Sequence, residues 1–343
     1  MQLGTSQVIQ MNRKKIMRKS GRELGILYAL IVFWIVSFAT NVHFRNINTY
    51  LNILRESSFV GLAAIGMTFC IISGAFDLSI ASMLALLAMI TAVGVEFLGV
   101  FPTVLIVLTL GMVFGAFNGI LVTKLKIPAF IATLAMLFIY RALAYIYSDG
   151  KYRQTMNVRF TNISNGSVLG IPIAFVIFVI LVIVGTIILR RTPLGRNILA
   201  VGNSEKASLI SGINVDLTKI IIFSLVGTFT AASAILITSR LWSANPGMKP
   251  GFEFEVIATV VLGGTSLAGG KGSVFNTFIS AILFASINTA MNMFHVDSYM
   301  QRIIIGIILL FAFSMTSIRE MTQTAVRMRR SRQQNDQPQE GNN

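Results

Sequence analysis

The side chains that could support chemistry in this chain are few. Its two histidines, His43 and His295, lie far apart in the sequence, and no partners for metal ligation accompany them. No phosphate-binding GxxxxGK[ST] loop is present, so we expect no nucleotide site of that kind. The sequence therefore predicts neither a metal site nor a catalytic set, and we expect a protein that is not an enzyme.

Polar residues inside the apolar stretches are mostly neutral. The charged residues Asp77, Arg141, Glu253 and Glu255 fall near the predicted ends of such stretches, which gives no proton or sodium relay. Deeper amides and hydroxyls suit the passage of an uncharged, polyhydroxylated solute. Each of them also fits an interhelical hydrogen bond, so both roles stay open. These candidates for a translocation path are Thr68, Ser73, Asn118, Asn276, Asn288 and Asn292.

Composition places these residues in a membrane. The chain has 343 residues, of which 54% are hydrophobic and 12% charged, and a mean hydropathy of +0.74. Soluble domains average about 25% charged residues. The net charge of +15 is gathered in short clusters beside apolar stretches, as the positive-inside rule predicts, so no nucleic-acid partner is expected. We therefore expect an all-α integral membrane protein.

Ten stretches are apolar over roughly the 20 residues that a membrane crossing requires. An even number of crossings places both termini on one side. The stretch 252–268 is short and rich in glycine; if it were re-entrant, the count would be nine and the basic tail would lie on the other side. The predicted spans are 24–41, 57–75, 79–98, 101–123, 128–147, 171–189, 218–240, 252–268, 273–294 and 299–317.

Basic residues predict the orientation of these spans. The segment 1–23 is strongly basic and is predicted to lie in the cytoplasm, as are the loop 190–217 and the polar tail 318–343, which is predicted to be disordered. Residues 24–317 form the transmembrane domain between them. The exception to the charge rule is the predicted outer loop Ser148–Gly170, which carries Lys151, Arg153 and Arg159.

Small residues recur at a spacing of four in one predicted span. Gly111, Gly115 and Gly119 form a small-xxx-small ladder, which lets two helix backbones approach closely. We expect tight helix packing along this ladder.

The longest polar interruption, Arg190–Lys219, carries local helix signals. Asn203 or Ser204 can cap a helix, Glu205 lies in its positive first turn, and Gly212 can close it in a left-handed conformation. A short helix over 204–211, outside the membrane, is predicted. Spanning segments on both sides would let it pass motion between the membrane and a cytosolic partner.

Three stretches together resemble a known family. They are GLAAIGMTFCIISGAFDLSIAS (Gly61–Ser82), GRNILAVGNSEKASLISGINV (Gly195–Val215) and FEFEVIATVVLGGTSLAGGKGS (Phe252–Ser273), with PAFIATLAML (Pro128–Leu137) as a fourth match. They are similar to ribose-type permease subunits of bacterial carbohydrate ABC importers, over about residues 24–317.

The resemblance implies a vitamin B12-permease-like (type II) importer fold in the bacterial inner membrane. It implies a second permease copy or paralogue, ATP-binding subunits that hold ATP and Mg²⁺ on the cytoplasmic face, and a periplasmic or lipid-anchored sugar-binding protein. Asp77 and the turn around Lys271 would lie on the ATPase side and assist. The residues that the resemblance implies for ATPase coupling are Asn203, Ser204, Glu205, Ala207, Ser208, Leu209, Ser211 and Gly212.

The function expected is therefore a permease for a neutral sugar, driven by a separate ATPase. The alternative is an ATP-independent facilitator or secondary carrier, although the lack of deeply placed ionisable residues disfavours an ion-coupled one. The sequence leaves the identity of the sugar open.

Overall fold

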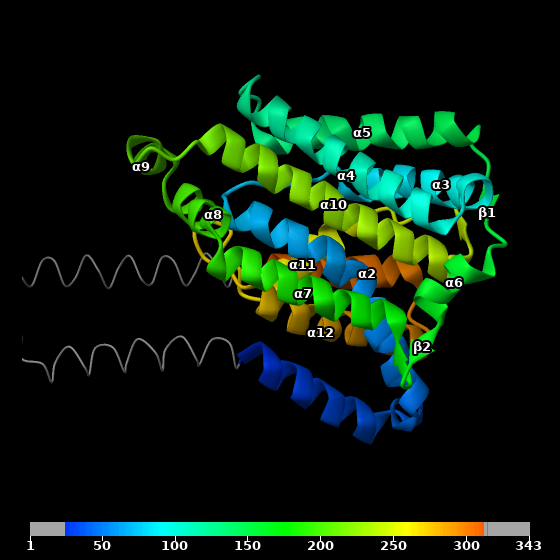
Figure 1. Ribbon diagram of the computed structural model, residues 1–343. Helices are drawn as coiled ribbons and strands as arrows, with labels where there is room; N and C mark the ends of the chain where they lie inside the picture. The colour runs from blue at the N-terminus through cyan, green and yellow to red at the C-terminus, as the bar shows by residue number, and fades with distance from the viewer. Residues whose placement is uncertain (1–24, 312–313, 315–343) are drawn as a thin grey trace, which may run out of the picture.

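The computed structural model describes residues 25–311 and 314, and the chain is a bundle of helices (Figure 1). Among these residues, seven helices are long and apolar enough to cross a membrane. They confirm the all-α membrane architecture and match seven of the predicted spans. The seven are α2 (Ile47–Ile72), α3 (Ile80–Leu98), α4 (Val100–Thr123), α5 (Ala129–Ser148), α7 (Ile173–Arg191), α10 (Val215–Leu241) and α12 (Val274–Met293).

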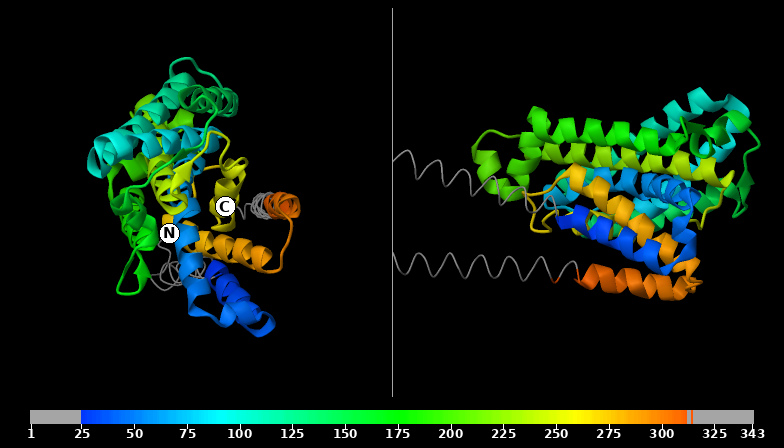
Figure 2. Two further views of the ribbon diagram at one scale, coloured as in Figure 1. Left: turned by 90° about the vertical axis from the view of Figure 1, so that its right-hand side faces the viewer. Right: turned by 90° about the horizontal axis from the view of Figure 1, so that it is seen from below.

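Two shorter apolar helices, Gly25–Thr40 and Ser298–Phe311, occupy the first and the last predicted spans. Figures 1 and 2 show that the first begins, and the second ends, at the same end of the bundle. The predicted N-terminus 1–23 and tail 318–343 lie outside the described residues.

Short elements close the two ends of the bundle. The helices α8 (Pro193–Asn203) and α9 (Glu205–Ile210) lie at one end, called here the α9 end (Figure 1). The opposite end, called the α6 end, carries six short elements in two strand pairs and two helices. These are η1 (Val42–Arg45), α6 (Val158–Asn165), the antiparallel pair β1 (Arg153–Gln154) and β4 (Ser243–Ala244), and the antiparallel pair β2 (Ser167–Val168) and β3 (Ile171–Pro172).

The predicted span 252–268 is wrong as a continuous helix. Helix α11 (Phe252–Leu262) has 11 residues, or about 16 Å at 1.5 Å per residue, against a hydrocarbon core of about 30 Å. Gly263 ends it, and Gly264 follows with φ of +82°. Residues 263–273 then continue without helix to the α9 end, where Gly270 N–H donates to the carbonyl of Ile72. The segment therefore runs from one end of the bundle to the other, half as helix and half as irregular chain.

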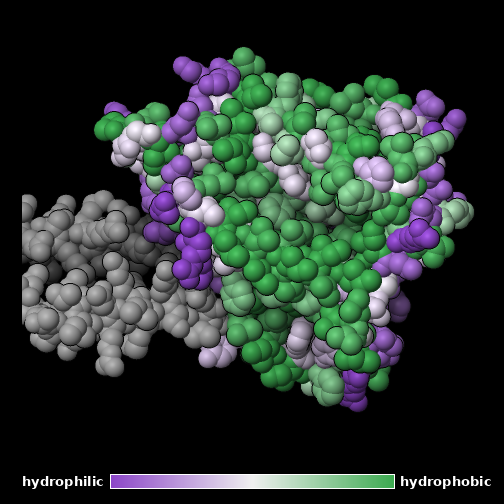
Figure 3. Space-filling view, viewed as in Figure 1, coloured by the Kyte–Doolittle hydropathy of each residue, from purple (hydrophilic) through white to green (hydrophobic). Residues whose placement is uncertain are grey.

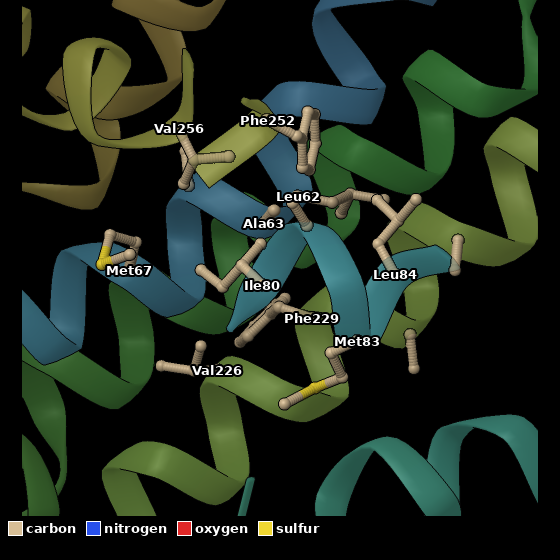
Figure 4. Close-up of a cluster of buried hydrophobic side chains, with 14 of the residues drawn as sticks. Leu62, Ala63, Met67, Ile80, Met83, Leu84, Val226, Phe229, Phe252 and Val256 are labelled. Atoms are coloured by element: carbon tan, nitrogen blue, oxygen red, sulfur yellow. The ribbon is translucent and has the colours of Figure 1, made fainter. Parts of the chain in front are cut away.

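Helix α2 lies at the centre of the bundle and packs against α7, α10, α11 and α12. Its side chains are mostly buried, because they meet apolar residues of neighbouring helices on every side. Figure 4 shows this core, where Leu62 and Met67 of α2 gather with Met83 of α3, Phe229 of α10 and Phe252 of α11. A helix buried on all faces is well placed to hold its neighbours in register.

The outer helices present apolar side chains outward. Most of the span windows of α4, α5 and α7 lie on the surface, with exposed side chains such as Phe117, Phe138 and Ile180. On the face seen in Figure 3, hydrophobic residues cover the middle and hydrophilic residues gather toward the two ends. Such a belt is what a bilayer requires.

The predicted glycine ladder is confirmed as a packing surface between α4 and α10. A methyl group on Gly115 would overlap the carbonyl oxygen of Phe223, and one on Gly111 would lie 2.5 Å from the carbonyl oxygen of Gly227. At the third position, a methyl group on Gly119 would lie only 2.8 Å from the Cα of Ile220. The two backbones are therefore as close as glycine permits.

Candidate functional site

Helix α8 is amphipathic and lies at the α9 end. Thr192 caps it by accepting a hydrogen bond from Gly195 N–H (3.3 Å), and Pro193 occupies its first turn. Its own side chains Ile198 and Val201 are buried. The sequence analysis missed this helix because its residues were interpreted as part of one polar, basic loop; the Thr192–Pro193 start was the signal that could have revealed it.

Helix α9 forms where the capping residues predicted it. Ser204 Oγ accepts from Ala207 N–H at 3.2 Å, which makes Ser204, and not Asn203, the N-cap. At the other end Gly212 has φ of +80°, and Ile213 N–H returns to the carbonyl of Ser208 at 3.0 Å. The helix predicted over 204–211 is therefore confirmed.

The candidate coupling residues form one exposed surface. Seven of the eight are exposed, and Ser208 is buried beneath them. Leu209 is 60% exposed, and its neighbour Ile210, which the sequence analysis passed over, is 81% exposed. Two adjacent aliphatic side chains at the end of a six-residue helix form an apolar tip suited to contact with another protein.

An ion pair ties α9 to the bundle. Glu205 Oε1 lies 2.5 Å from Lys219 Nζ on α10, and the Lys219 side chain is only 15% exposed. A second pair at the same end, Lys124 with Asp216 at 3.0 Å, is more exposed and joins the end of α4 to the start of α10.

Asp77 does not lie on the surface that α9 presents. It belongs to the link 73–79 between α2 and α3, which starts at the α9 end, and its side chain is fully buried, so it offers no direct contact at the surface; that it assists coupling stays a prediction. Ser79 N–H and Oγ–H donate to its Oδ1 at 2.9 and 2.6 Å, and Asn118 Nδ2 donates to its Oδ2 at 3.2 Å. Tyr140 extends the network, since its hydroxyl lies 3.2 Å from Asn118 Oδ1.

In this network the carboxyl group of Asp77 is the acceptor, and groups of Ser79 and Asn118 are the donors. Burial raises the pKa of the Asp77 carboxyl above its ordinary value, while the hydrogen bonds from Ser79 and Asn118 act in the opposite direction. By contrast Lys271, in the other turn that the sequence analysis named, is exposed at the α9 end.

The candidates for the translocation path do not form one cluster. Thr68 on α2 shares a hydrogen bond of 2.8 Å with Thr277 on α12. Ser73 donates to the carbonyl of Cys70 at 2.7 Å, at the end of α2. Asn118 is committed to the Asp77 network.

The three asparagines of α12 have different surroundings. Asn276 Oδ1 and Asn288 Oδ1 are buried and accept no hydrogen bond from the described part of the chain. Asn292 is exposed, and its Oδ1 accepts from Gln301 Nε2 at 2.8 Å. A buried amide oxygen without a donor has acceptor capacity left for a hydroxyl group.

The loop Ser148–Gly170 is folded onto the bundle at the α6 end. Arg55 Nε on α2 donates to the carbonyl of Ser164 at 2.9 Å, and Glu96 Oε1 on α3 accepts from Thr155 Oγ1 at 2.7 Å. Lys151 and Arg159 remain exposed. Two helices of the core thereby hold a basic surface in place.

Within residues 25–311 and 314, no group of three or more His, Cys, Asp or Glu side chains is arranged to hold a metal ion. The surfaces and polar groups described above are therefore the candidates for function in this part of the chain.

Comparison with known proteins shows the family to which the chain belongs. Residues 49–313 match the family model described as branched-chain amino acid transport system / permease component. No solved structure matches the chain.

Curated relatives cover most of the chain. Ribose import permease protein RbsC of Haemophilus influenzae is 39% identical over 83% of this chain and 90% of its own length. The Bacillus subtilis protein of the same name is 38% identical over 87% and 92%. The L-arabinose transport system permease protein AraH of Escherichia coli K12 is 35% identical over 82% and 88%.

The match of the family model to most of the chain agrees with the apolar belt and the spanning helices. The chain belongs to the family of branched-chain amino acid transport system permease components, and it is a multi-pass membrane permease of an ABC importer and not an enzyme.

Proposed function

We propose that this chain forms the translocation path for a neutral sugar and is driven by ATP hydrolysis in a separate subunit. The observation that carries the proposal is helix α9, which places an apolar tip of Leu209 and Ile210 outside the belt of spanning helices. The ion pair of Glu205 with Lys219 links that helix directly to α10. A force on α9 would therefore act on the bundle.

The chemistry of the polar residues supports an uncharged, hydroxylated solute. The buried acceptors Asn276 Oδ1 and Asn288 Oδ1 and the hydroxyls of Thr68 and Thr277 carry no charge. The relatives named above are permeases for ribose and L-arabinose, which are solutes of this class. We propose that Thr68, Asn276 and Asn288 contribute to the path.

The complete importer would contain further subunits. We propose a second permease copy or paralogue and ATPase subunits that bind ATP and Mg²⁺ and receive α9. At the other end, a periplasmic or lipid-anchored binding protein would deliver the sugar to the α6 end, where Lys151 and Arg159 are exposed. The α9 end and both termini would be cytoplasmic, in accord with the basic residues of the loop 190–217.

We further propose ten crossings in a vitamin B12-permease-like fold. Seven would be the long helices, two would be the shorter helices Gly25–Thr40 and Ser298–Phe311, and one would be α11 together with residues 263–273. Labelling of single introduced cysteines from either side of the membrane tests this topology. The native Cys70 is fully buried, so it is expected to add little background labelling.

An ATP-independent facilitator is the rival function. The test is ATP hydrolysis by the chain co-purified with its ATPase in nanodiscs, with and without the binding protein and a panel of neutral sugars. Stimulation that requires the binding protein and one sugar would establish the importer and identify its substrate. Flux of sugar through the chain alone in liposomes would favour the facilitator.

A further inference from the structure

Three main-chain segments meet at the α9 end with no side chain between them. Gly202 lies near the end of α8, Ile72 ends α2, and Gly270 lies in the irregular segment that follows α11. The N–H of Gly270 donates to the carbonyl of Ile72 at 2.7 Å. A methyl group on Gly202 would overlap that same carbonyl oxygen and would lie 2.6 Å from the nitrogen of Gly270.

Neighbouring glycines make the contact close from the other side as well. Gly269 has φ of +82°, and a methyl group there would lie 2.6 Å from the carbonyl oxygen of Gly202 and 3.2 Å from the nitrogen of Gly74. We call the set Ile72, Gly202, Gly269 and Gly270 the glycine junction. The close contacts of Gly202 and Gly269 are with main-chain atoms, which cannot give way by changing rotamer as side chains do, while Gly270 is also covered by the Asn203 side chain.

The glycine junction joins the exposed helix α9 to two non-helical segments, the link 73–79 and residues 263–273. On one side, α8 continues through Ser204 into α9. On the other side, Ile72 leads into the link 73–79, which the Asp77 network fastens to α4 and α5, and Gly270 leads back to α11 and on to α12.

Residues 263–273 are the place where this part of the bundle can bend. A helix resists bending because its hydrogen bonds are internal, whereas loop and terminal residues absorb changes in φ and ψ. In the segment 263–273, Gly264, Gly269 and Gly270 have positive φ, which glycine adopts without steric cost. A displacement transmitted to Gly270 thus arrives within this irregular segment, and one transmitted to Ile72 arrives beside the link that the Asp77 network fastens to α4 and α5.

We propose that the glycine junction is the contact through which displacement of α9 by an ATPase is delivered to the ends of α2 and α11, with Gly202 and Gly270 as its positioning residues. This inference rests on the proposed function, since it needs an ATPase that acts on α9. It goes further by naming the residues that carry the motion inward from the docking surface.

The first test is Gly202→Ala in the complete complex, reconstituted in proteoliposomes with the ATPase and the loaded binding protein. The surface of α9 is unchanged in this variant, so the ATPase is expected to co-purify in the ordinary ratio. The amount of sugar imported per ATP hydrolysed is expected to fall about tenfold, which corresponds to a coupling loss in the usual range. Gly306→Ala is the control, because nothing lies within 4 Å of the added methyl group.

The outcomes separate this inference from the function on which it rests. A wild-type complex that no sugar stimulates would refute the proposed importer. A working wild-type complex together with a Gly202→Ala complex that imports the normal amount of sugar per ATP would overturn the glycine junction alone.

A second measurement decides the matter where Gly202→Ala fails to assemble. Spin labels are attached to cysteines at Lys206 on α9, which is outside the coupling set, and Ala268 beside the glycine junction, both exposed, while the native Cys70 is fully buried. The distance between the labels is expected to be the same with and without ATP. A pair at Lys206 and Asn162, at the α6 end, is expected to change. A change in the first distance, or none in the second, overturns the proposal.

Discussion

Asn118 Nδ2 lies 3.2 Å from Asp77 Oδ2 and 2.8 Å from Ser79 Oγ, and these contacts fasten α4 to the link between α2 and α3. Within the described part of the chain every hydrogen bond to the Asp77 carboxylate comes from a neutral donor, and no cation forms an ion pair with it. The geometry therefore requires both side-chain positions that Asp77 Oδ1 and Oδ2 occupy to be hydrogen-bond acceptors.

Asp77→Asn tests this requirement. The new amide would point an N–H₂ group at existing donors, leaving buried groups unpaired, at a cost of about 1–3 kcal/mol in the free energy of unfolding. A lower melting temperature in detergent is expected. Asp216→Asn, at an exposed carboxylate paired with Lys124, is the control and should change stability little. Equal melting temperatures for the two variants would contradict the role assigned to Asp77.

Gly115→Val tests the contact between α4 and α10. A side chain there would overlap the carbonyl of Phe223, which belongs to a helix backbone and cannot move aside. We expect a loss of about 1–3 kcal/mol, as for overpacked cores, and poor recovery of folded protein from the membrane. Thermal unfolding followed by size-exclusion chromatography measures it, with Gly306→Val as the control in open space. Normal recovery of Gly115→Val would show that the two helices are less tightly packed than described.

Replacing Glu205 and Leu209 together by alanine tests the docking surface on α9. The double variant removes the link to Lys219 and half of the apolar tip, so transport should be lost while insertion in the membrane stays normal. Sugar uptake by cells, normalised to the amount of protein in the membrane, is the measurement. Leu241→Ala, at a leucine of similar exposure in the last turn of α10, is the control. Undiminished uptake by the double variant would sink the assignment of α9.

The two ion pairs at the α9 end differ in exposure and should differ in effect. Lys124→Ala removes a pair whose lysine is 62% exposed, so a change of about 0–1 kcal/mol is expected. Lys219→Ala removes the less exposed partner of Glu205 and should loosen α9. Hydrogen exchange of residues 205–211 reports this directly: faster exchange is expected in Lys219→Ala and not in Lys124→Ala. The reverse order would show that Glu205 does not anchor the helix.

Local signals explain what the sequence analysis predicted well. The ends of α9 follow from Ser204 and Gly212 alone, because caps act within one turn. The ladder of Gly111 and Gly115 follows from spacing, although its partner Gly227 on α10 does not, since that pairing depends on how the helices assemble.

Tertiary contacts explain what the sequence analysis missed. Asp77 was placed near the end of a predicted span, but its burial could not be predicted, because its partner Asn118 comes from another helix. The stretch 252–268 was recognised as short and rich in glycine, but the point at which its helix ends, after Leu262, could not be predicted, because hydropathy does not distinguish a helix from an irregular segment buried in protein. No local pattern indicates that Gly202 and Gly270 meet, since each glycine alone is ordinary.

The contact of Gly202 with Ile72 and Gly270 involves the main chain, whereas the contact offered to a partner by Leu209 and Ile210 involves side chains. Recognition of a partner would therefore depend on side chains, whereas transmission of motion would depend on the main chain. Under the proposed function, substitutions on α9 adapt the permease to another ATPase while the main-chain contact stays the same. Compatibility between subunits would then evolve separately from the transmission of motion through the permease.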